Sequence, residues 1–495
     1  MKKSITYSVI TLLILGFCLP MKAQILPHSP MRETRAVWLT TFLGLDWPKT
    51  KARDEMGINA QKAELCAMLD KLEAAGINTV LFQTRIRGTV IYPSRIEPWD
   101  ACLTGKEGRA PGYDPLQFAI DECHRRGMAF HAWVVAMKVG DKTYLDPSDT
   151  SVGAKLSAIC CEIAARYDVD GISFDYLRYP EDPKTINDKK KHAANGRGLT
   201  YSDWRRDNVT RIVRKVYNDI KAVKPYLWVT SSPVGKYSDV AGQSAGGWNA
   251  RNRVYQDIER WMNEGIHDGI YPMMYFKDNN FYPFALQWAE MAEASGKMAT
   301  GAVCPGLGIY FMSPKEKNWP LTDITRELEF MRRQGMGQCY FRAKFLTDNT
   351  KGLLDWLRLY HNREKALPMP LANCHPTLRD VPQADSVTVK YYDFDHATLR
   401  VHSGAAPYYN VYTLIGGDTI LVKAMCTDPE YSFSPRVLMS EKAEIGVKMM
   451  SRYGFEGKMT VIALKNWENL TAVTGKSITF AAERRKLFNI NLTNK

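Results

Sequence analysis

Residues 115–135, PLQFAIDECHRRGMAFHAWVV, contain the unit from which most of this chain is built. Residues 115–126 carry apolar side chains at helical spacing, and Gly127 follows as a residue that can end a helix with positive φ. Residues 129–135 are mostly apolar without alternation, which is typical of a strand buried on both faces of a parallel sheet. The stretch therefore predicts a helix, a glycine stop and a buried strand.

The same pattern recurs throughout residues 33–365. Eight strand candidates begin near Arg35, Asn78, Ala129, Asp170, Leu227, Gly269, Met298 and Gln338. Helical patterns lie between them, and several end at a glycine. This regular alternation predicts a (β/α)8 TIM barrel over residues 33–365. A doubly wound open sheet is the alternative, but no glycine-rich phosphate loop follows the first strand.

The composition changes after residue 365. Residues 366–384 contain several prolines and are expected to form a linker. Residues 385–482 alternate apolar and polar side chains in short runs, and residues 416–418, Gly-Gly-Asp, are typical of a hairpin turn. These features predict a C-terminal immunoglobulin- or fibronectin-like β-sandwich.

The first residues have the order of an export signal. Lys2 and Lys3 precede an apolar run over residues 5–19, and Ala23 offers a cleavage point. An uncleaved anchor and a lipoprotein modified at Cys18 are the alternatives. No later segment is apolar and long enough to span a membrane. We expect residues 1–23 to be removed, leaving an exported protein without a stable membrane span, in the periplasm, at the cell surface or secreted.

The charge and the cysteines exclude several classes of protein. The net charge is +13, but the basic residues are scattered and no nucleic-acid motif is present, so no nucleic-acid partner is expected. The ten cysteines show no C-x-x-C spacing, and the histidines show no zinc spacing. We therefore expect no metal and no organic cofactor. One or two disulfides and the oligomeric state stay open.

The stretch DGISFDYLRYP, residues 170–180, carries the main catalytic candidate. Asp175 stands near the C-terminal end of the fourth strand, where alternation points it away from Phe174 and into the barrel mouth. A buried carboxylate is costly unless it is paired or used in chemistry. Arg178 would keep Asp175 ionised. A purely structural ion pair between these two residues is the alternative interpretation.

Two further acidic residues are candidates for a second catalytic carboxyl group. Asp278 follows the sixth strand, but it also precedes Asn279 and Asn280, a composition typical of turns. Glu97 lies in the long loop after the second strand.

Polar and aromatic side chains also gather at the strand ends and in the neighbouring loops. Sugar rings pack their C–H faces on aromatic rings, and their hydroxyls need polar partners, so this mixture predicts a carbohydrate substrate. A bridging role for Arg85 and a core position for His131 are the structural alternatives. The substrate-binding candidates are Gln83, Arg85, Trp99, His131, Trp133, Tyr176, Arg178, Tyr275 and Arg342.

Five short motifs together resemble the glycosyl-hydrolase-10-like family of exported bacterial proteins. They are RETRAVWLT at 32–40, IYPS at 91–94 with the Pro-Trp that follows at 98–99, GYDPL at 112–116, HAW at 131–133 and FDYLRYP at 174–180. The resemblance implies a (β/α)8 barrel with glycoside hydrolase activity. Some relatives are linked to bacterial cell-wall glycan, which implies a substrate class here.

The sequence also departs from better-known barrel glycosidases. The seventh strand runs into Val-Cys-Pro-Gly at 303–306 and offers no carboxylate. Of the D-G-x-D-x-D-x-E pattern on a fourth strand, Ser173 and Leu177 replace two acids. We expect a two-carboxylate hydrolase, with Asp175 as nucleophile or stabilising carboxylate and Asp278 or Glu97 as acid. A non-catalytic glycan-binding barrel is the alternative; a polysaccharide deacetylase would need a metal cluster.

Overall fold

The computed structural model describes residues 30–296, 302–371, 374–393, 395–403, 406–440 and 443–462. Three predictions therefore lie wholly or partly outside the described residues. They are the export signal over 1–23, the end of the sandwich over 463–482, and most of the segment 298–303 expected as the seventh strand.

A parallel sheet of nine short strands forms the centre of the larger domain. Its order is β6–β5–β4–β3–β2–β1–β9–β8–β7. The strands are β1 (Arg35–Leu39), β2 (Thr79–Arg85), β3 (Ala129–Val135), β4 (Gly171–Asp175), β5 (Trp228–Ser231), β6 (Gly269–Ile270), β7 (Met273–Met274), β8 (Gly306–Leu307) and β9 (Gln338–Phe341).

The two ends of this order are two pieces of one strand. Only Tyr271 and Pro272 separate β6 from β7, and a proline has no N–H for the ladder. Ile270 is also bridged in parallel to Val303. The sheet consequently curls round to meet itself as a TIM-like barrel. Val303, the last residue of the predicted seventh strand, makes this bridge, and β8 follows it; most of the predicted strand lies outside the described residues.

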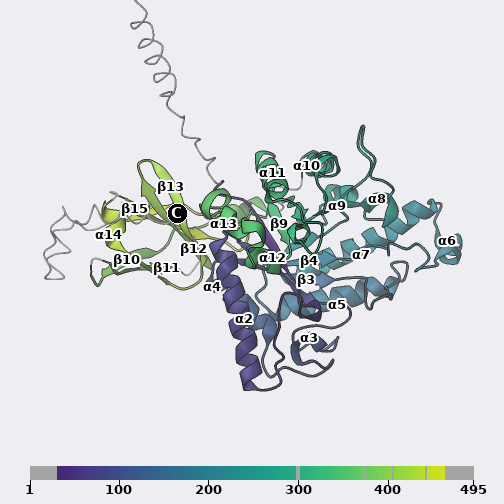
Figure 1. The fold of residues 1–495 in the computed structure, drawn as a ribbon, viewed down its shortest axis with the longest axis horizontal. Coiled ribbons are helices and arrows are strands. Elements are labelled where there is room, and N and C mark those ends of the chain that lie inside the picture. The colour runs from purple at the N-terminus through teal and green to yellow at the C-terminus, as the bar shows by residue number, and fades with distance from the viewer. Residues whose placement is uncertain are drawn as a thin grey trace, which may run out of the picture.

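Helices surround this sheet, as Figure 1 shows. The larger ones are α2 (Glu55–Ala74), α4 (Pro115–Arg125), α5 (Thr150–Arg166), α7 (Tyr201–Val223), α9 (Ile258–Glu264), α10 (Tyr282–Ser295) and α11 (Leu321–Arg333). Shorter pieces are η1 (Phe42–Gly44), α3 (Ala101–Thr104), α6 (Lys189–Asn195), α8 (Ala250–Arg253), η2 (Asp278–Asn280), η3 (Ile309–Met312), α12 (Ala343–Thr347), η4 (Thr350–Gly352), α13 (Leu353–Trp356) and η5 (Leu357–His361).

Helix α4 illustrates how the sequence sets these elements. The Asp114 side chain accepts hydrogen bonds from the backbone N–H groups of Leu116 and Gln117, and Pro115 occupies the first turn. Gly127 follows the helix with φ +68°. The chain then turns directly into β3, as the opening stretch predicts.

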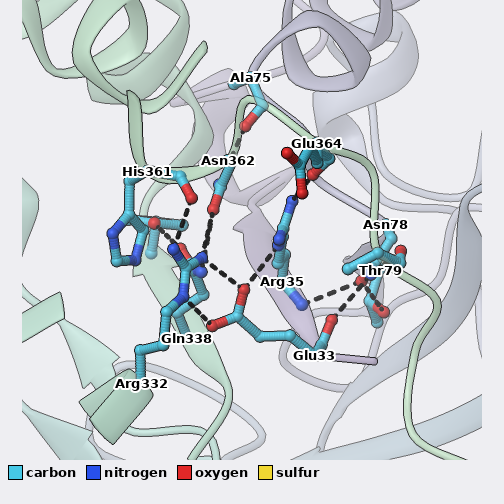
Figure 2. Close-up of polar contacts among 12 residues, drawn as sticks. Glu33, Arg35, Ala75, Asn78, Thr79, Arg332, Gln338, His361, Asn362 and Glu364 are labelled. Carbon is cyan, nitrogen blue, oxygen red and sulfur yellow. Dashed lines mark hydrogen bonds and ion pairs between the residues drawn. The ribbon is translucent and has the colours of Figure 1, made fainter. Parts of the chain in front are cut away.

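A buried ion network joins the start of β1 to α11 (Figure 2). The Glu33 carboxylate accepts from Arg35 Nε at 2.7 Å and from Arg332 Nη2 at 2.6 Å. Burial alone would raise the pKa of Glu33, but the two arginines bring it below its ordinary value. The side chain of Asn362 accepts from the same Arg332, at 3.1 Å. The network holds the first strand to the last helices of the barrel.

The C-terminal region consists of two small antiparallel sheets. One has the order β10 (Ser386–Tyr391), β11 (Ala397–His402), β14 (Glu430–Phe433); the other has β13 (Asp418–Cys426), β12 (Tyr408–Ile415), β15 (Glu444–Met450), β16 (Thr460–Ile462). Side chains of both sheets, including Leu399 and Val447, belong to one apolar cluster. The predicted hairpin is confirmed, since Ile415 pairs with Asp418. An immunoglobulin- or fibronectin-type topology stays a prediction.

These sheets cover the end of the barrel at which the strands begin. Arg452 donates to Asp168 at 2.6 Å and to the Tyr408 hydroxyl at 2.7 Å. Tyr408 in turn donates to Asp170, just before β4, at 3.1 Å. Figure 1 shows β12 and β13 beside the barrel helices α2 and α4. These contacts lie at the start of β4, at the opposite end from the one where the strands finish.

The cysteines and the helices bear on two further expectations. The nine cysteines within the described ranges are all free thiols, so the disulfides left open by the sequence do not form there. Of the helices in the same ranges, none combines the length and the apolar character that a membrane crossing needs.

Candidate active site

A cavity of about 310 Å³ opens at the C-terminal ends of the barrel strands. Its wall contains side chains from β1, β2, β3, β4, β7 and β9 or from the residues that follow them. Seven of the residues predicted from the sequence lie in this wall: Gln83, Trp133, Asp175, Tyr176, Arg178, Tyr275 and Arg342.

Asp175 is the last residue of β4 and is 8% exposed. Its carboxylate accepts a hydrogen bond from the backbone N–H of Tyr176 at 2.7 Å. Burial raises the pKa of Asp175 to about 6, although Arg178 and the Tyr176 N–H act in the opposite direction. Asp175 is the one carboxylic acid in the described wall of the cavity. A carboxyl group with this pKa can hold and release a proton near neutral pH.

Tyr176 turns the chain sharply as it leaves the strand. Its φ of +52° lies in the left-handed region, where a bulky residue is strained. Such strain persists only where the surroundings over-determine it, and it clusters at functional sites. The Tyr176 ring carries the Arg178 guanidinium over its face, 4.6 Å from the ring centroid. The turn therefore brings Asp175 and Arg178 to one cavity.

Arg178 makes its ion pair with Glu181 and not with Asp175. Its Nη2 donates to Glu181 Oε1 at 2.6 Å, while the side chain is almost fully buried. Among the described residues, Asp175 and Arg178 form no ion pair with each other, which contradicts the structural alternative. In the same part of the chain, Arg178 Nε and Nη1 have no hydrogen-bond partner. A buried donor without a partner costs about 1–3 kcal/mol, which a ligand with acceptor atoms would recover.

One more side chain in the cavity wall has an unused polar atom. Ser232 is buried, and its Oγ has no hydrogen-bond partner among the described residues. The Trp133 indole, in the same wall, helps to lower the pKa of Asp175 as a hydrogen-bond donor. This arrangement suits a polar ligand that is rich in oxygen atoms.

Gln83 and Arg342 hold the loop that follows β1. The Gln83 side-chain oxygen accepts from Thr40 Oγ1 at 2.6 Å and from the backbone N–H of Phe42 at 2.9 Å. Arg342 forms an ion pair with buried Asp46 and donates to the carbonyl of Leu45 at 2.8 Å. Both residues line the cavity, and both also fix its rim.

Glu97 and Arg85 are engaged with each other away from the cavity wall. Arg85 Nε donates to Glu97 at 2.6 Å, and Arg85 Nη2 donates at 2.7 Å. Arg85 also donates to the carbonyl of Ala136 at 3.0 Å, beside the end of β4. These are the contacts of a pair that supports the barrel, so the expectation that Glu97 and Arg85 face the substrate is not met.

His131 lies at the wrong end of the barrel for substrate binding. It pairs with Gly171, the first residue of β4, and lines a cavity of about 40 Å³ beneath the C-terminal sheets. Burial lowers its pKa to about 4, so the ring is neutral. Position 131 falls near the start of its strand and outside the wall of the mouth cavity, whereas Trp133, two residues further on, lines that cavity.

Asp278 and Trp99 also lie outside the wall of the mouth cavity. Asp278 is exposed in the turn η2, with φ +54°. Trp99 is partly buried in the loop after β2 and packs against the barrel core.

Several wall residues were not among the candidates, and Ser232 and Phe341 are the clearest. Each stands at or just after the end of a strand, so the signal that singled out Asp175 would have found them too. Glu181 is the other omission, and its ion pair with Arg178 could not be read from spacing alone. Within the described ranges, no three His, Cys, Asp or Glu side chains are grouped so as to hold a metal ion.

Comparison with known proteins gives the chain a family. The model of the family "Glycosyl hydrolase-like 10" matches residues 33–140 and 134–311. "Glycosyl hydrolase DigH" of Escherichia coli (strain K12) is 34% identical over 286 residues, a match that covers 49% of this chain and 65% of that protein. "Glycosyl hydrolase YngK" of Bacillus subtilis (strain 168) is 28% identical over 400 residues, a match that covers 72% of this chain and 77% of that protein. The chain thus spans less than two thirds of the DigH relative.

Solved structures of low sequence identity have partly similar folds. The glycoside hydrolase domain of PgaB (BpsB) from Bordetella bronchiseptica is 11% identical with a TM-score of 0.47, covering 66% of this chain and 99% of that one. The endo-β-1,4-mannanase of Thermotoga petrophila is 10% identical with a TM-score of 0.42, and the match covers 88% of this chain and 99% of that one. The family model, by contrast, matches more than half of the sequence. The chain belongs to the glycosyl hydrolase-like 10 family.

Proposed function

We propose that this protein hydrolyses glycosidic bonds, with Asp175 as the proton donor. The observation that carries the proposal is the buried carboxyl group in the mouth cavity, whose pKa is raised to about 6. Hydrolysis needs a carboxylic acid that protonates the leaving oxygen. Burial favours the protonated form, so the structure supports this role for Asp175 better than that of an ionised nucleophile.

Glu181 is the proposed second carboxylate. Its charge raises the pKa of Asp175, and it forms an ion pair with Arg178, which lines the cavity. Glu181 is half-exposed, so a water molecule or a sugar can reach it. Asp278 and Glu97 have neither property: Asp278 is exposed on a turn outside the wall, and Glu97 is bound to Arg85. We therefore propose a two-carboxylate mechanism with Asp175 and Glu181.

The proposed substrate is bacterial cell-wall glycan. Three arginines, Arg87, Arg178 and Arg342, line the cavity, whereas its described wall contains one carboxyl group, that of Asp175. Unused N–H donors on Arg178 suit the carboxylate or carbonyl oxygens that such glycans carry. The expected export of the protein would place it in the periplasm or at the cell surface, where this polymer occurs.

The test is a screen of the purified full chain against bacterial wall glycan and plant polysaccharides, with released reducing ends measured. Asp175→Asn should reduce turnover of the cleaved glycan by about 10²–10⁴-fold, the usual contribution of a positioned acid. Glu181→Gln should cause a loss of the same order. Full activity of Glu181→Gln would refute the second carboxylate and leave a mechanism in which the substrate's own acetamido group attacks. Binding without release of reducing ends would establish the non-catalytic glycan-binding barrel instead.

A further inference from the structure

A continuous set of aromatic rings leads out of the mouth cavity. Tyr275 and Phe341 line the cavity, with ring centroids 5.2 Å apart. The ring centroid of Tyr310, on η3, lies 6.0 Å from that of Tyr275 and 5.9 Å from that of Phe341. The ring centroid of Phe311 lies 4.1 Å from that of Tyr310. We call Tyr310 and Phe311 the outer rings. They do not belong to the cavity wall, but they extend its aromatic side outwards.

The outer rings are held firmly and yet are accessible. Both are partly exposed. Tyr310 is fixed through its contacts with Tyr275, Phe341 and, at 6.3 Å, Phe345. Its hydroxyl makes no hydrogen bond with the residues that the structure describes. An ordered aromatic ring with an unused hydroxyl can bind a ligand at little cost in conformational entropy.

Two cationic side chains lie close to this aromatic surface. Lys317 Nζ lies 3.7 Å from the Phe311 centroid and 5.7 Å from that of Trp319. The Arg342 guanidinium lies 5.1 Å from the Phe345 centroid and also lines the cavity. These groups can donate hydrogen bonds to hydroxyl or carboxylate oxygens of a sugar whose ring packs on the aromatic surface.

We propose that the outer rings form a second sugar-binding subsite, occupied by a neighbouring unit of the glycan that enters the mouth cavity. The inference rests on the proposed function, because it takes the ligand to be a glycan. The aromatic surface is continuous from Tyr275 to Tyr310, so one chain of linked sugar rings can lie on both residues. Affinity should therefore rise with the length of the glycan.

The test separates binding from turnover by using Asp175→Asn as the background. Its affinity is measured by calorimetry for wall-glycan oligosaccharides of two and of six sugar units. Adding Tyr310→Ala should weaken binding of the longer ligand by about 2–13-fold, the equivalent of one aromatic contact. Binding of the shorter ligand should be unchanged within twofold. Tyr310→Phe keeps the aromatic ring, so the affinity for the longer ligand should fall much less. Tyr392→Ala, which removes a ring that is 54% exposed in the C-terminal region, is the matched control.

Equal loss for both ligands, or no loss for either in a variant with a normal melting temperature, would overturn the subsite. If Tyr310→Ala unfolds the protein, Phe311→Ala and Lys317→Ala provide the same comparison from the other side of the surface. An inactive wild-type chain would refute the proposed hydrolysis but leave the binding result intact. The two failures are therefore distinguishable.

Discussion

Arg85 Nε and Nη2 each donate to one oxygen of Glu97, at 2.6 and 2.7 Å. The Arg85 side chain has no exposed surface, and that of Glu97 is 4% exposed. Arg85 comes from β2 and Glu97 from the loop that follows, so the pair ties this loop back to the barrel. Because Arg85 also binds the carbonyl of Ala136, the same pair supports the backbone next to Asp175.

Glu97→Gln should destabilise the protein by about 3–5 kcal/mol, because it leaves a buried guanidinium without its counter-charge. Turnover per folded molecule should stay within a few-fold of wild type. Chemical denaturation and an activity assay on the folded fraction measure the two quantities. Glu329→Gln, which removes a surface pair with Arg333 at 3.3 Å, is the control and should cost less than about 1 kcal/mol. Lost turnover at unchanged stability would make Glu97 a catalytic acid after all.

The activity should depend on the protonation of Asp175. Its pKa is raised to about 6, so a proton donor at this position is available below that pH and lost above it. The kcat/KM for the cleaved glycan should therefore fall as pH rises through about 6. A profile that rises through the same range would show that the ionised form works, as expected of a nucleophile.

The same carboxyl group should make the folded state less stable at higher pH. The unfolded chain loses this proton near 3.8 and the folded protein only near 6, so the folded state binds more protons between these values and its stability falls as pH rises. Asp175→Asn removes this penalty and should stabilise the fold at pH 7 by about 3 kcal/mol or less. Denaturant titrations of both proteins at pH 4 and pH 7 check it. A destabilised Asp175→Asn would indicate a structural role.

Gly127 should tolerate a side chain much less well than Gly296. Both follow a helix with positive φ, +68° and +58°, so alanine costs about 1–2 kcal/mol at each for the left-handed backbone. A β-carbon at Gly127 would lie 2.2 Å from the carbonyl oxygen of Ala424, whereas no atom of the described residues lies within 4 Å of that position at Gly296. Gly127→Ala should therefore lower the melting temperature clearly more than Gly296→Ala. Equal shifts would mean that the C-terminal sheets do not pack here.

Glu327 should be a source of instability. Neither of its carboxylate oxygens has a hydrogen-bond partner among the described residues, the residue is 1% exposed, and burial raises its pKa well above 4.5. The unfolded chain ionises first as pH rises, so this group lowers stability progressively above about pH 4.5. Glu327→Met should stabilise the protein at pH 7 by about 1–3 kcal/mol. Glu329→Gln on the same helix is the exposed control, and a destabilised Glu327→Met would reveal an unseen partner.

The barrel could be predicted because its strands are apolar on both faces and its helices end at glycines. Asp175 could be placed at the mouth for the same reason, since it closes a buried run. His131 was misplaced because a strand of seven residues crosses the barrel from one end to the other, and composition does not tell which end a residue reaches. Glu97 was misread because its partner, Arg85, is found only once the loop has folded back. A single sequence does not show which residues pair across space.

The covered end of the barrel gives this architecture a practical property. The contacts of Gly127, Tyr408 and Arg452 lie where the strands begin, and the mouth cavity lies where they finish. Loops at the mouth can therefore diverge between relatives, or be transplanted by an engineer, without touching the seam between barrel and C-terminal sheets. A chimera that keeps the seam of this chain and takes the mouth loops of another should fold as this one does.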